Sequence, residues 1–391
     1  MSDALIIDAT RTPWGKFGGA LKEHRASDLA ALLIRRLVER NDVDPAAIDN
    51  VLLGQVLQAG AGQLPSRQAL IGGGLPETTP STLINKVCGS GMRAVTLAAG
   101  LIRSGETRMM LAGGMESMSN VPYYDTYTRW GARMGNKTLI DGMVMDGLWC
   151  AFDDVHMANQ ADDMAAQREV SREEMDEWSV TSQRRWGAAQ ESGYFEREIT
   201  PVPNKRDPNH VALVKDEGPR PNSTVERLAR INTVYGTKAI TAGNAPGVTD
   251  GAAMLLIASE EEAARMKAKP LARIAGWAET AGLPREFPVA SAHAIRKVLA
   301  KTGLSIDDMA AIEVNEAFAC VPLICGQELN WDPERVNRHG GSVAMGHPIG
   351  ASGARLTLTL AYQLRETGGK YAVGAICSGT GQGDAILLEA V

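Results

Sequence analysis

Two segments near opposite ends of this 391-residue chain resemble each other, and this repeat constrains the fold more than any other feature. An alignment without gaps pairs GMRAVTLAAGLIRSGETRMMLAGG (residues 91–114) with GARLTLTLAYQLRETGGKYAVGAI (residues 353–376), and Gly91 matches Gly353. Each copy has a glycine-rich entry, an amphipathic helix and a buried strand. We therefore expect two similar halves that meet at a pseudo-twofold axis, with their helix starts facing one centre.

The rest of the chain alternates between strand-like and helix-like apolar patterns, which is typical of an α/β protein. The pattern predicts strands at residues 4–8, 51–57 and 108–113. It predicts helices at residues 27–40, 91–103, 171–192 and 290–302. The last third of the chain resumes the pattern, with further buried segments at residues 252–258 and 271–276. The chain is too long for one ordinary core, which agrees with a duplicated fold.

The middle of the chain differs in composition from both ends. Aromatic and polar clusters, followed by the stretch PVPNKRDPNH, interrupt the α/β pattern there. We therefore expect an inserted loop or lid domain, since binding residues are often found in such segments. The expected organisation is the first part of the N-terminal half at 1–119, the inserted domain at 120–245, the completion of the N-terminal half at 246–270 and the C-terminal half at 271–391.

Charge and apolar patterning argue against several classes of partner. The net charge is −6 and no block of Lys or Arg stands out, so we expect no nucleic-acid partner. No apolar run approaches the roughly 20 residues that span a bilayer, so we expect no membrane partner. The N-terminus lacks the pattern of a secretory signal, and we expect a cytoplasmic protein. The five cysteines include no CxxC pair, which predicts free thiols and no metal site.

Cys88 is the first candidate for chemistry. It stands directly before Gly89 and the start of the predicted helix at 91–103. The start of a helix lowers the pKa of a cysteine through its unpaired N–H groups and dipole, and the thiolate is the reactive form. Taken alone, however, the same residue also fits a buried structural cysteine.

Three further residues stand in settings that suit catalysis. His347 lies between Gly346 and Pro348 in the repeat counterpart of the Cys88 region, where it can act as a base or as a donor to an oxyanion. Cys377 follows a buried strand and precedes alternating glycines, whose N–H groups can face a developing negative charge. Asn315 lies at the end of a predicted strand, where its amide could hold a water. A satisfied turn histidine and a strand-to-helix cap are the alternatives.

Taken together, these segments resemble the thiolase family over nearly the whole chain. The resemblance rests on long motifs in the family's order: DATRTPWGKFGGAL, NKVCGSGMRA, AGGMESMS, AFDDVHM, TAGNAPGVTDGAA, NEAFA, GGSVAMGHPIGASGAR and CSGTGQGDA. It implies an α/β thiolase fold, in which duplicated βαβαβαββ halves form an αβαβα layered sandwich with an inserted loop domain.

The resemblance also implies a role for each candidate residue. Cys88 would be the acylated nucleophile, and His347 would take its proton and help to hold the thioester oxygen. Cys377 would be the second acid/base, which moves a proton on the α-carbon of the attacking acetyl-CoA. Asn315 would position a water in one oxyanion hole, and the N–H groups of Cys88 and Gly379 would form the other.

The implied reaction is the reversible condensation of two acetyl-CoA to acetoacetyl-CoA and CoA through an acyl-cysteine, as in the biosynthetic type of the family. The alternative is a 3-ketoacyl-CoA thiolase that acts on longer or branched substrates in fatty-acid breakdown. Acyl-CoA and CoA are then substrates, no cofactor is expected, and the family suggests a homotetramer. Two rivals remain: a decarboxylating ketosynthase, which usually pairs its cysteine with two histidines, and a thiolase-like binding protein without turnover.

The resemblance places coenzyme A along the inserted domain. The implied contacts are Leu148, His156, Met157, Arg220, Ala245, Gly247, Phe287 and Phe318. His156 also fits a packed lid residue, and Arg220 a solvated charge. Three positions depart from the family pattern and leave acyl chain length and CoA geometry open. They are Pro246 in place of a serine, Arg227 in place of a small polar residue, and the stretch around Phe287.

Overall fold

The two halves of the chain arrange their strands in the same way when each half is followed outward from the middle of the sheet. The computed structural model describes residues 2–391. In the first half β1 pairs antiparallel with β12, β12 antiparallel with β5, and β5 parallel with β3, which is parallel to β4. In the second half β13 pairs antiparallel with β16, β16 antiparallel with β15, and β15 parallel with β14. The predicted duplication is thus confirmed.

The two halves join where β1 pairs with β13 over a short stretch. The strands of the first half are β1 (Ala4–Arg11), β2 (Gly15–Lys16), β3 (Asn50–Gly54), β4 (Ser81–Ile84), β5 (Met109–Ser117) and β12 (Thr249–Ser259). The strands of the second half are β13 (Ala272–Ala281), β14 (Met309–Val314), β15 (Tyr371–Ser378) and β16 (Gln382–Glu389).

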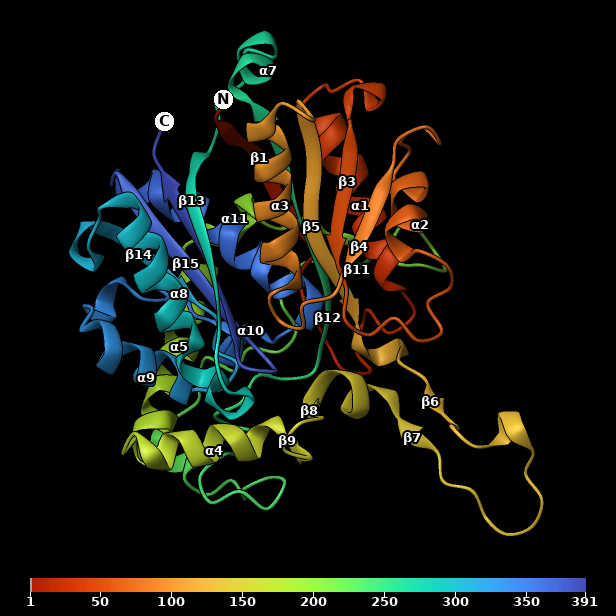
Figure 1. Ribbon diagram of the computed structural model, residues 1–391, viewed down its shortest axis with the longest axis vertical. Helices are drawn as coiled ribbons and strands as arrows, with labels where there is room; N and C mark the ends of the chain where they lie inside the picture. The colour runs from red at the N-terminus through yellow and green to blue at the C-terminus, as the bar shows by residue number, and fades with distance from the viewer. Residues whose placement is uncertain (1) are drawn as a thin grey trace.

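Helices cover the sheets in three layers (Figure 1). The helices α3 and α11 lie together in the middle, α1 and α2 cover the outer face of the first half, and α8 and α9 cover the outer face of the second half. This is the expected αβαβα sandwich. The helices of the two halves are α1 (Ala26–Arg40), α2 (Pro65–Gly72), α3 (Ser90–Ser104), α7 (Glu260–Arg265), α8 (Phe287–Thr302), α9 (Cys320–Leu329), α10 (Ser342–Met345) and α11 (Ile349–Thr367).

The second half keeps the βαβαβαββ order but has almost no counterpart of β4. Only a single bridge between Ile312 and Val336 remains. The side chain of Asn337 takes over the pairing of the strand end, because its Oδ1 accepts the N–H of Val314 at 2.8 Å and its Nδ2 donates to the Val314 carbonyl at 2.9 Å. Asn337 has φ 47°, which turns the chain away from an extended path.

The two central helices approach each other closely because glycines face the contact. A Cβ atom on Gly353 would lie 2.5 Å from the backbone N of Met92, and one on Gly91 would lie 2.8 Å from the Gly350 carbonyl oxygen. Any larger residue there would push the helices apart. The glycines of the repeat therefore bring the starts of α3 and α11 to one place.

The inserted segment is spread over the sandwich: α4 (Met157–Gln167) lies at the bottom of Figure 1, whereas α5 (Arg172–Glu191) and β11 (Val211–Leu213) lie higher in that view. Its helices are α4 (Met157–Gln167), α5 (Arg172–Glu191) and α6 (Val225–Leu228). Its short strands are β6 (Tyr123–Tyr124), β7 (Ile140–Asp141), β8 (Trp149–Cys150), β9 (Val155–His156), β10 (Val202–Pro203) and β11 (Val211–Leu213). Buried Arg11 of β1 anchors the segment, since it donates to Glu198 at 3.0 Å and to Asp216 at 2.6 and 3.0 Å.

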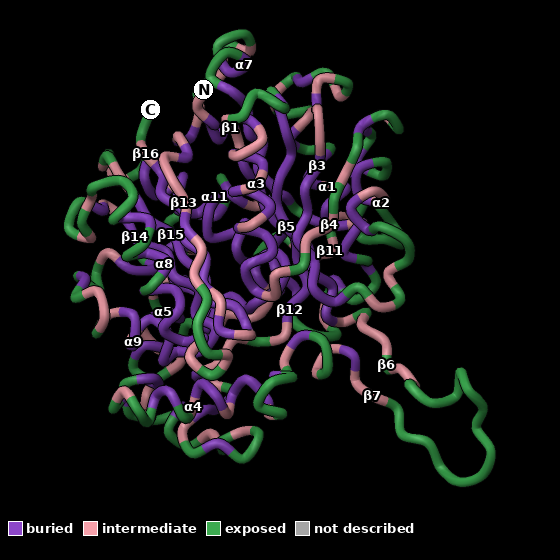
Figure 2. The backbone as a smooth tube through the Cα atoms, viewed as in Figure 1, coloured by how far each residue is buried: buried purple, intermediate pink, exposed green. Residues whose placement is uncertain are grey.

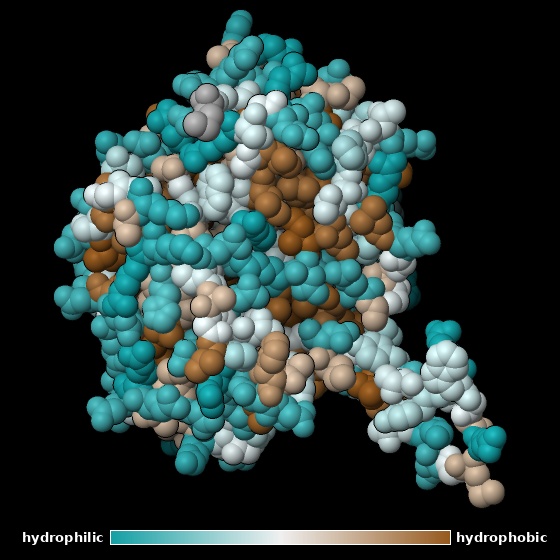
Figure 3. Space-filling view, in the orientation of Figure 1, coloured by the Kyte–Doolittle hydropathy of each residue, from teal (hydrophilic) through white to brown (hydrophobic). Residues whose placement is uncertain are grey.

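Two surface features remain without a partner in the described chain. The arm around β6 and β7 projects from the body and is exposed over residues 126–139, and Trp130 within it is 86% exposed (Figure 2). A hydrophobic patch lies over α3, where Leu97 and Leu101 are only partly buried (Figure 3). No helix within residues 2–391 is long and apolar enough to span a membrane.

Candidate active site

Cys88 lies in a tight turn immediately before α3 and is almost fully buried, with 4% of its surface exposed. Its own N–H and the N–H of Gly379 face the sulfur and favour the thiolate. Burial has the larger effect, however, and raises the pKa of the Cys88 thiol to about 12. The expectation that the helix start would lower this pKa is therefore wrong, because desolvation outweighs the N–H groups.

His347 supplies a proton acceptor for this thiol. Its Nε2 lies 3.3 Å from Cys88 Sγ, and its Nδ1 lies 2.6 Å from Ser352 Oγ. Ser352 donates its own hydroxyl to the Pro348 carbonyl at 2.9 Å, so its oxygen accepts from Nδ1–H. Nε2 is then left unprotonated and faces the thiol. Burial, assisted by the charge of Arg355, lowers the pKa of His347 to about 3, and the resting pair is a neutral thiol and a neutral imidazole.

These two pKa values predict a flat pH profile for acylation of the free enzyme. His347 stays neutral above about pH 3 and Cys88 stays protonated below about pH 12, so neither group titrates near neutrality. The second-order rate of Cys88 acetylation by acetyl-CoA should change less than about threefold between about pH 6 and pH 9. Single-turnover measurements by intact mass would check this. A sigmoidal rise with a midpoint near the ordinary histidine pKa would contradict it.

Asn315 is oriented toward the same imidazole. It follows β14 and is fully buried, and its Oδ1 accepts the hydroxyl of Ser342 at 2.7 Å. That bond turns its Nδ2 toward His347 Nε2, at 3.5 Å. The two nitrogens thus face one small region beside the Cys88 sulfur, which suits the predicted water site.

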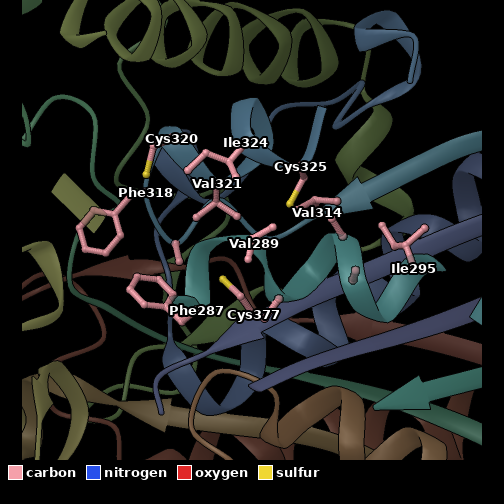
Figure 4. Packing of buried hydrophobic residues seen from close by; sticks show 14 of the residues in the cluster. Phe287, Val289, Ile295, Val314, Phe318, Cys320, Val321, Ile324, Cys325 and Cys377 are labelled. Atoms are coloured by element: carbon pink, nitrogen blue, oxygen red, sulfur yellow. The ribbon is translucent and has the colours of Figure 1, made fainter. Parts of the chain in front are cut away.

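Cys377 lies at the end of β15 and is fully buried. Burial, and then the nearby Cys88, raise the pKa of its thiol well above the ordinary value. Figure 4 shows its side chain beside Phe287 and Val289, from the start of α8. Gly379 follows two residues later, so the end of β15 brings a second thiol, and the loop after it an N–H group, to the Cys88 sulfur.

An apolar cavity of about 120 Å³ opens onto Cys88. It brings together most of the residues expected there, which are Cys88, Leu148, His156, Met157, Ala245, Gly247, Phe318 and His347. Pro246 also lines it. Phe287 does not, since it is fully buried and its ring lies behind that of Phe318, at 6.2 Å between centroids.

A second, more polar cavity of about 100 Å³ shares Ala245 and Gly247 with the first. Arg220 and Lys16 line it, and Arg220 is exposed to solvent. Arg227 lines neither cavity, and one of its guanidinium nitrogens donates to the Asn222 carbonyl at 3.1 Å. The two cavities therefore adjoin at Ala245 and Gly247, with Lys16 and Arg220 lining one and Cys88 lining the other.

The sequence did not reveal several residues of this site. Tyr235 lines the inner cavity and stacks on His156, with ring centroids 3.7 Å apart, although it is 58% exposed and no local pattern marks it. Ser342 and Ser352 orient the catalytic candidates, and both lie in the GGSVAMGHPIGASGAR motif. The presence of serine hydroxyl groups close to His347 in that motif was the signal in the sequence that could have indicated this role.

Glu316, beside Asn315, has a structural role. Its carboxylate accepts four hydrogen bonds of 2.9 to 3.0 Å, from Trp178, Ser182, Asn337 and the N–H of Val343. It thereby ties α5 of the inserted segment to the strand end that carries Asn315. Within residues 2–391, no group of three or more His, Cys, Asp or Glu side chains is placed to hold a metal ion.

Comparison with known proteins places this site in a family. The model of the thiolase N-terminal domain matches residues 4–261, and that of the thiolase C-terminal domain matches residues 268–390. The chain belongs to the thiolase family. It is 43% identical to an acetyl-CoA acetyltransferase of Pseudomonas aeruginosa, over 99% of each chain. It is 41% identical to a probable acetyl-CoA acetyltransferase of Escherichia coli K12, over 100% of this chain and 99% of that one. The crystal structure of human mitochondrial 3-ketoacyl-CoA thiolase matches with a TM-score of 0.96 and 37% identity, over 100% of this chain and 99% of that one.

Proposed function

We propose that this acyltransferase catalyses the reversible condensation of two acetyl-CoA to acetoacetyl-CoA and CoA. The observation that supports this most directly is the Cys88–His347 pair at the base of the apolar cavity, with the Gly379 N–H facing the sulfur. A neutral thiol with an adjacent base can form an acyl-enzyme, which divides a difficult carbon–carbon bond formation into two steps.

In the first step the Cys88 sulfur attacks the thioester carbonyl of acetyl-CoA while its proton moves to His347 Nε2. The N–H groups of Cys88 and Gly379 donate hydrogen bonds to the developing oxyanion. Collapse of the adduct breaks the bond to the CoA sulfur, which leaves with the proton from His347. The acetyl group then stays on Cys88, and all groups return to their neutral forms.

In the second step the Cys377 thiol passes its proton to His347 Nε2, and the resulting thiolate removes a proton from the methyl carbon of a second acetyl-CoA. The Nε2–H of His347 and a water held by Asn315 donate to the enolate oxygen. The carbanion attacks the acetyl-Cys88 carbonyl, acetoacetyl-CoA forms, and the Cys88 sulfur is released as a thiolate that takes the proton from His347. Thiolysis is the same sequence in reverse.

The small inner cavity supports a short acyl group. Met157 and Phe318 close its wall, and Phe287 packs behind Phe318. We expect kcat/KM for thiolysis to be highest for acetoacetyl-CoA and to fall as the 3-ketoacyl chain lengthens. A rise with chain length would favour the alternative function, a 3-ketoacyl-CoA thiolase for longer or branched substrates; the human structural relative is itself named a 3-ketoacyl-CoA thiolase.

Removal of the Phe318 ring should relax this preference. In a Phe318→Ala variant the space in front of Phe287 becomes available to a longer acyl chain. We expect kcat/KM for a six-carbon 3-ketoacyl-CoA to rise about tenfold relative to acetoacetyl-CoA, the scale of discrimination set by apolar pockets. Acetoacetyl-CoA on the same variant is the internal control, and an unchanged ratio would place chain-length selection elsewhere.

The remaining expectations complete the proposal. CoA thioesters act as substrates, and the reaction as written needs no resident cofactor. The unpartnered arm with Trp130 and the hydrophobic patch over α3 suit contacts between copies of the chain, in agreement with a homotetramer. A cytoplasmic location, a role in fatty-acid metabolism and the absence of nucleic-acid or membrane partners remain part of the proposal.

A further inference from the structure

The two loops that carry the Cys88 and Gly379 N–H groups both contain a β-branched residue in the left-handed backbone region. Val87, directly before Cys88, has φ 49°, and Thr380, directly after Gly379, has φ 73°. This conformation is unfavourable for β-branched residues and persists only where neighbouring contacts impose it. Those contacts therefore determine where the two N–H groups point.

One side chain, Ser378, joins the two loops. Ser378 directly precedes Gly379, and its Oγ accepts the N–H of Gly89 at 2.8 Å. Gly89 directly follows Cys88, so this bond links the backbone beside the nucleophile to the backbone beside the second N–H group. Because the Ser378 oxygen is the acceptor here, its hydroxyl hydrogen remains free to reach another acceptor.

Asp384, on the adjacent strand β16, lies beside the same backbone. Its Oδ2 is buried and has no hydrogen-bond partner within residues 2–391. A Cβ atom on Gly89 would lie 2.6 Å from Asp384 Oδ2 and 2.8 Å from Ser378 Oγ, so both oxygens lie on the same side of Gly89. The Asp384 carboxylate therefore packs against Gly89, whose N–H the Ser378 oxygen accepts.

Lys86 links Asp384 to the loop that carries Cys88. Its Nζ lies 2.7 Å from Asp384 Oδ1 and 2.6 Å from Glu279 Oε2. The side chains of Lys86 and Asp384 are only 12% and 3% exposed, so solvent screens their attraction little. Lys86 lies two residues before Cys88, and the ion pair therefore ties β16 back to the nucleophile loop.

We propose that Ser378 and Asp384, with Lys86, are positioning residues that hold the N–H groups of Cys88 and Gly379 at the spacing an oxyanion needs. This inference rests on the proposed function, since it assigns those N–H groups to the thioester oxygen. The three side chains do not touch the reacting atoms. They act through the backbone of Gly89 and of the loop after β15.

The test compares two reactions of Cys88 in the full-length protein. Acetylation by acetyl-CoA passes through an oxyanion, whereas alkylation by iodoacetamide does not. In Ser378→Ala and Asp384→Asn variants we expect single-turnover acetylation to slow at least about tenfold, which is less than the loss typical when a whole oxyanion donor is removed. Alkylation should stay within about threefold of the unmodified protein. Ser378→Thr keeps the oxygen and should restore acetylation.

Ser259→Ala is the matched control. Ser259 also accepts one backbone N–H, from Glu262, but it starts α7 at the opposite end of the molecule (Figure 1). The Ser259→Ala variant should be acetylated at Cys88 at the normal rate. Normal acetylation in Ser378→Ala or Asp384→Asn would overturn the inference, as would an equal loss of alkylation and acetylation. Failure of the unmodified protein to acetylate Cys88 would instead refute the proposed function.

Discussion

A Cys88→Ser variant is expected to lose at least about a thousandfold in turnover, in both condensation and thiolysis, on the scale seen when a catalytic nucleophile is removed. The serine oxygen would occupy nearly the same place beside His347 Nε2. A hydroxyl is much harder to deprotonate than a thiol, however, and burial has already lowered the pKa of His347 to about 3. So weak a base cannot activate an alcohol. Initial rates of acetoacetyl-CoA thiolysis would measure the loss.

Cys150→Ser provides the comparison for this variant. Cys150 is another free and buried thiol, in β8, and it lines neither cavity. We expect the Cys150→Ser variant to keep its activity within about threefold, because a conservative change away from the reaction centre has a small effect. Substantial turnover by Cys88→Ser, with Cys150→Ser unchanged, would remove Cys88 from the mechanism.

The second large effect is expected at Cys377, and it should separate the two half-reactions. A Cys377→Ser variant keeps the Cys88–His347 pair, so acetyl-CoA should still acetylate Cys88 at close to the normal rate. Condensation needs a base that takes a proton from the methyl carbon, and a serine hydroxyl loses its own proton far less readily than a thiol, so it cannot become that base. We expect condensation to fall at least about a hundredfold. Intact mass reports acetylation, and acetoacetyl-CoA formation reports condensation.

Two results would contradict the assignment of Cys377 to condensation alone. If Cys377→Ser is not acetylated at Cys88, then Cys377 takes part in acylation as well. If it condenses acetyl-CoA normally, another group moves the α-proton. Acetylation of Cys150→Ser under the same conditions would show that loss of a buried thiol does not by itself prevent the first step.

The repeat was sufficient to predict two similar halves, because it places equivalent helix–strand units at the two ends of the chain, whereas the layered sandwich followed from the resemblance to the thiolase family. Sequence patterns failed where a side chain replaced backbone pairing. The strand predicted at 51–57 ends at Gly54, since the N–H groups of Val56 and Leu57 donate to the buried Glu116 carboxylate instead. Asn337 similarly substitutes for a strand in the second half. The spacing of apolar residues does not indicate where a side chain takes the place of a strand partner.

The motifs were sufficient to select the catalytic candidates but not to describe their chemistry. Cys88, His347, Asn315 and Cys377 all come together around one cavity or directly beside it. The sign of the Cys88 pKa shift was wrong, because burial depends on the whole fold while the helix start is visible locally. The contact between Ser378 and Gly89 joins distant parts of the chain, and nothing in either segment alone indicates it.

The central position of α3 and α11 has a consequence for how the protein folds. Each of these helices is covered on one side by its own half and on the other side by the opposite half. Until the halves dock, each therefore exposes an apolar helix face to water, and such intermediates are prone to aggregation. Neither half alone can bury both faces of its central helix, so we expect each half to depend on the other for its stability. The reaction centre takes Cys88 from one half and His347 from the other, and it is therefore complete only when the halves are docked.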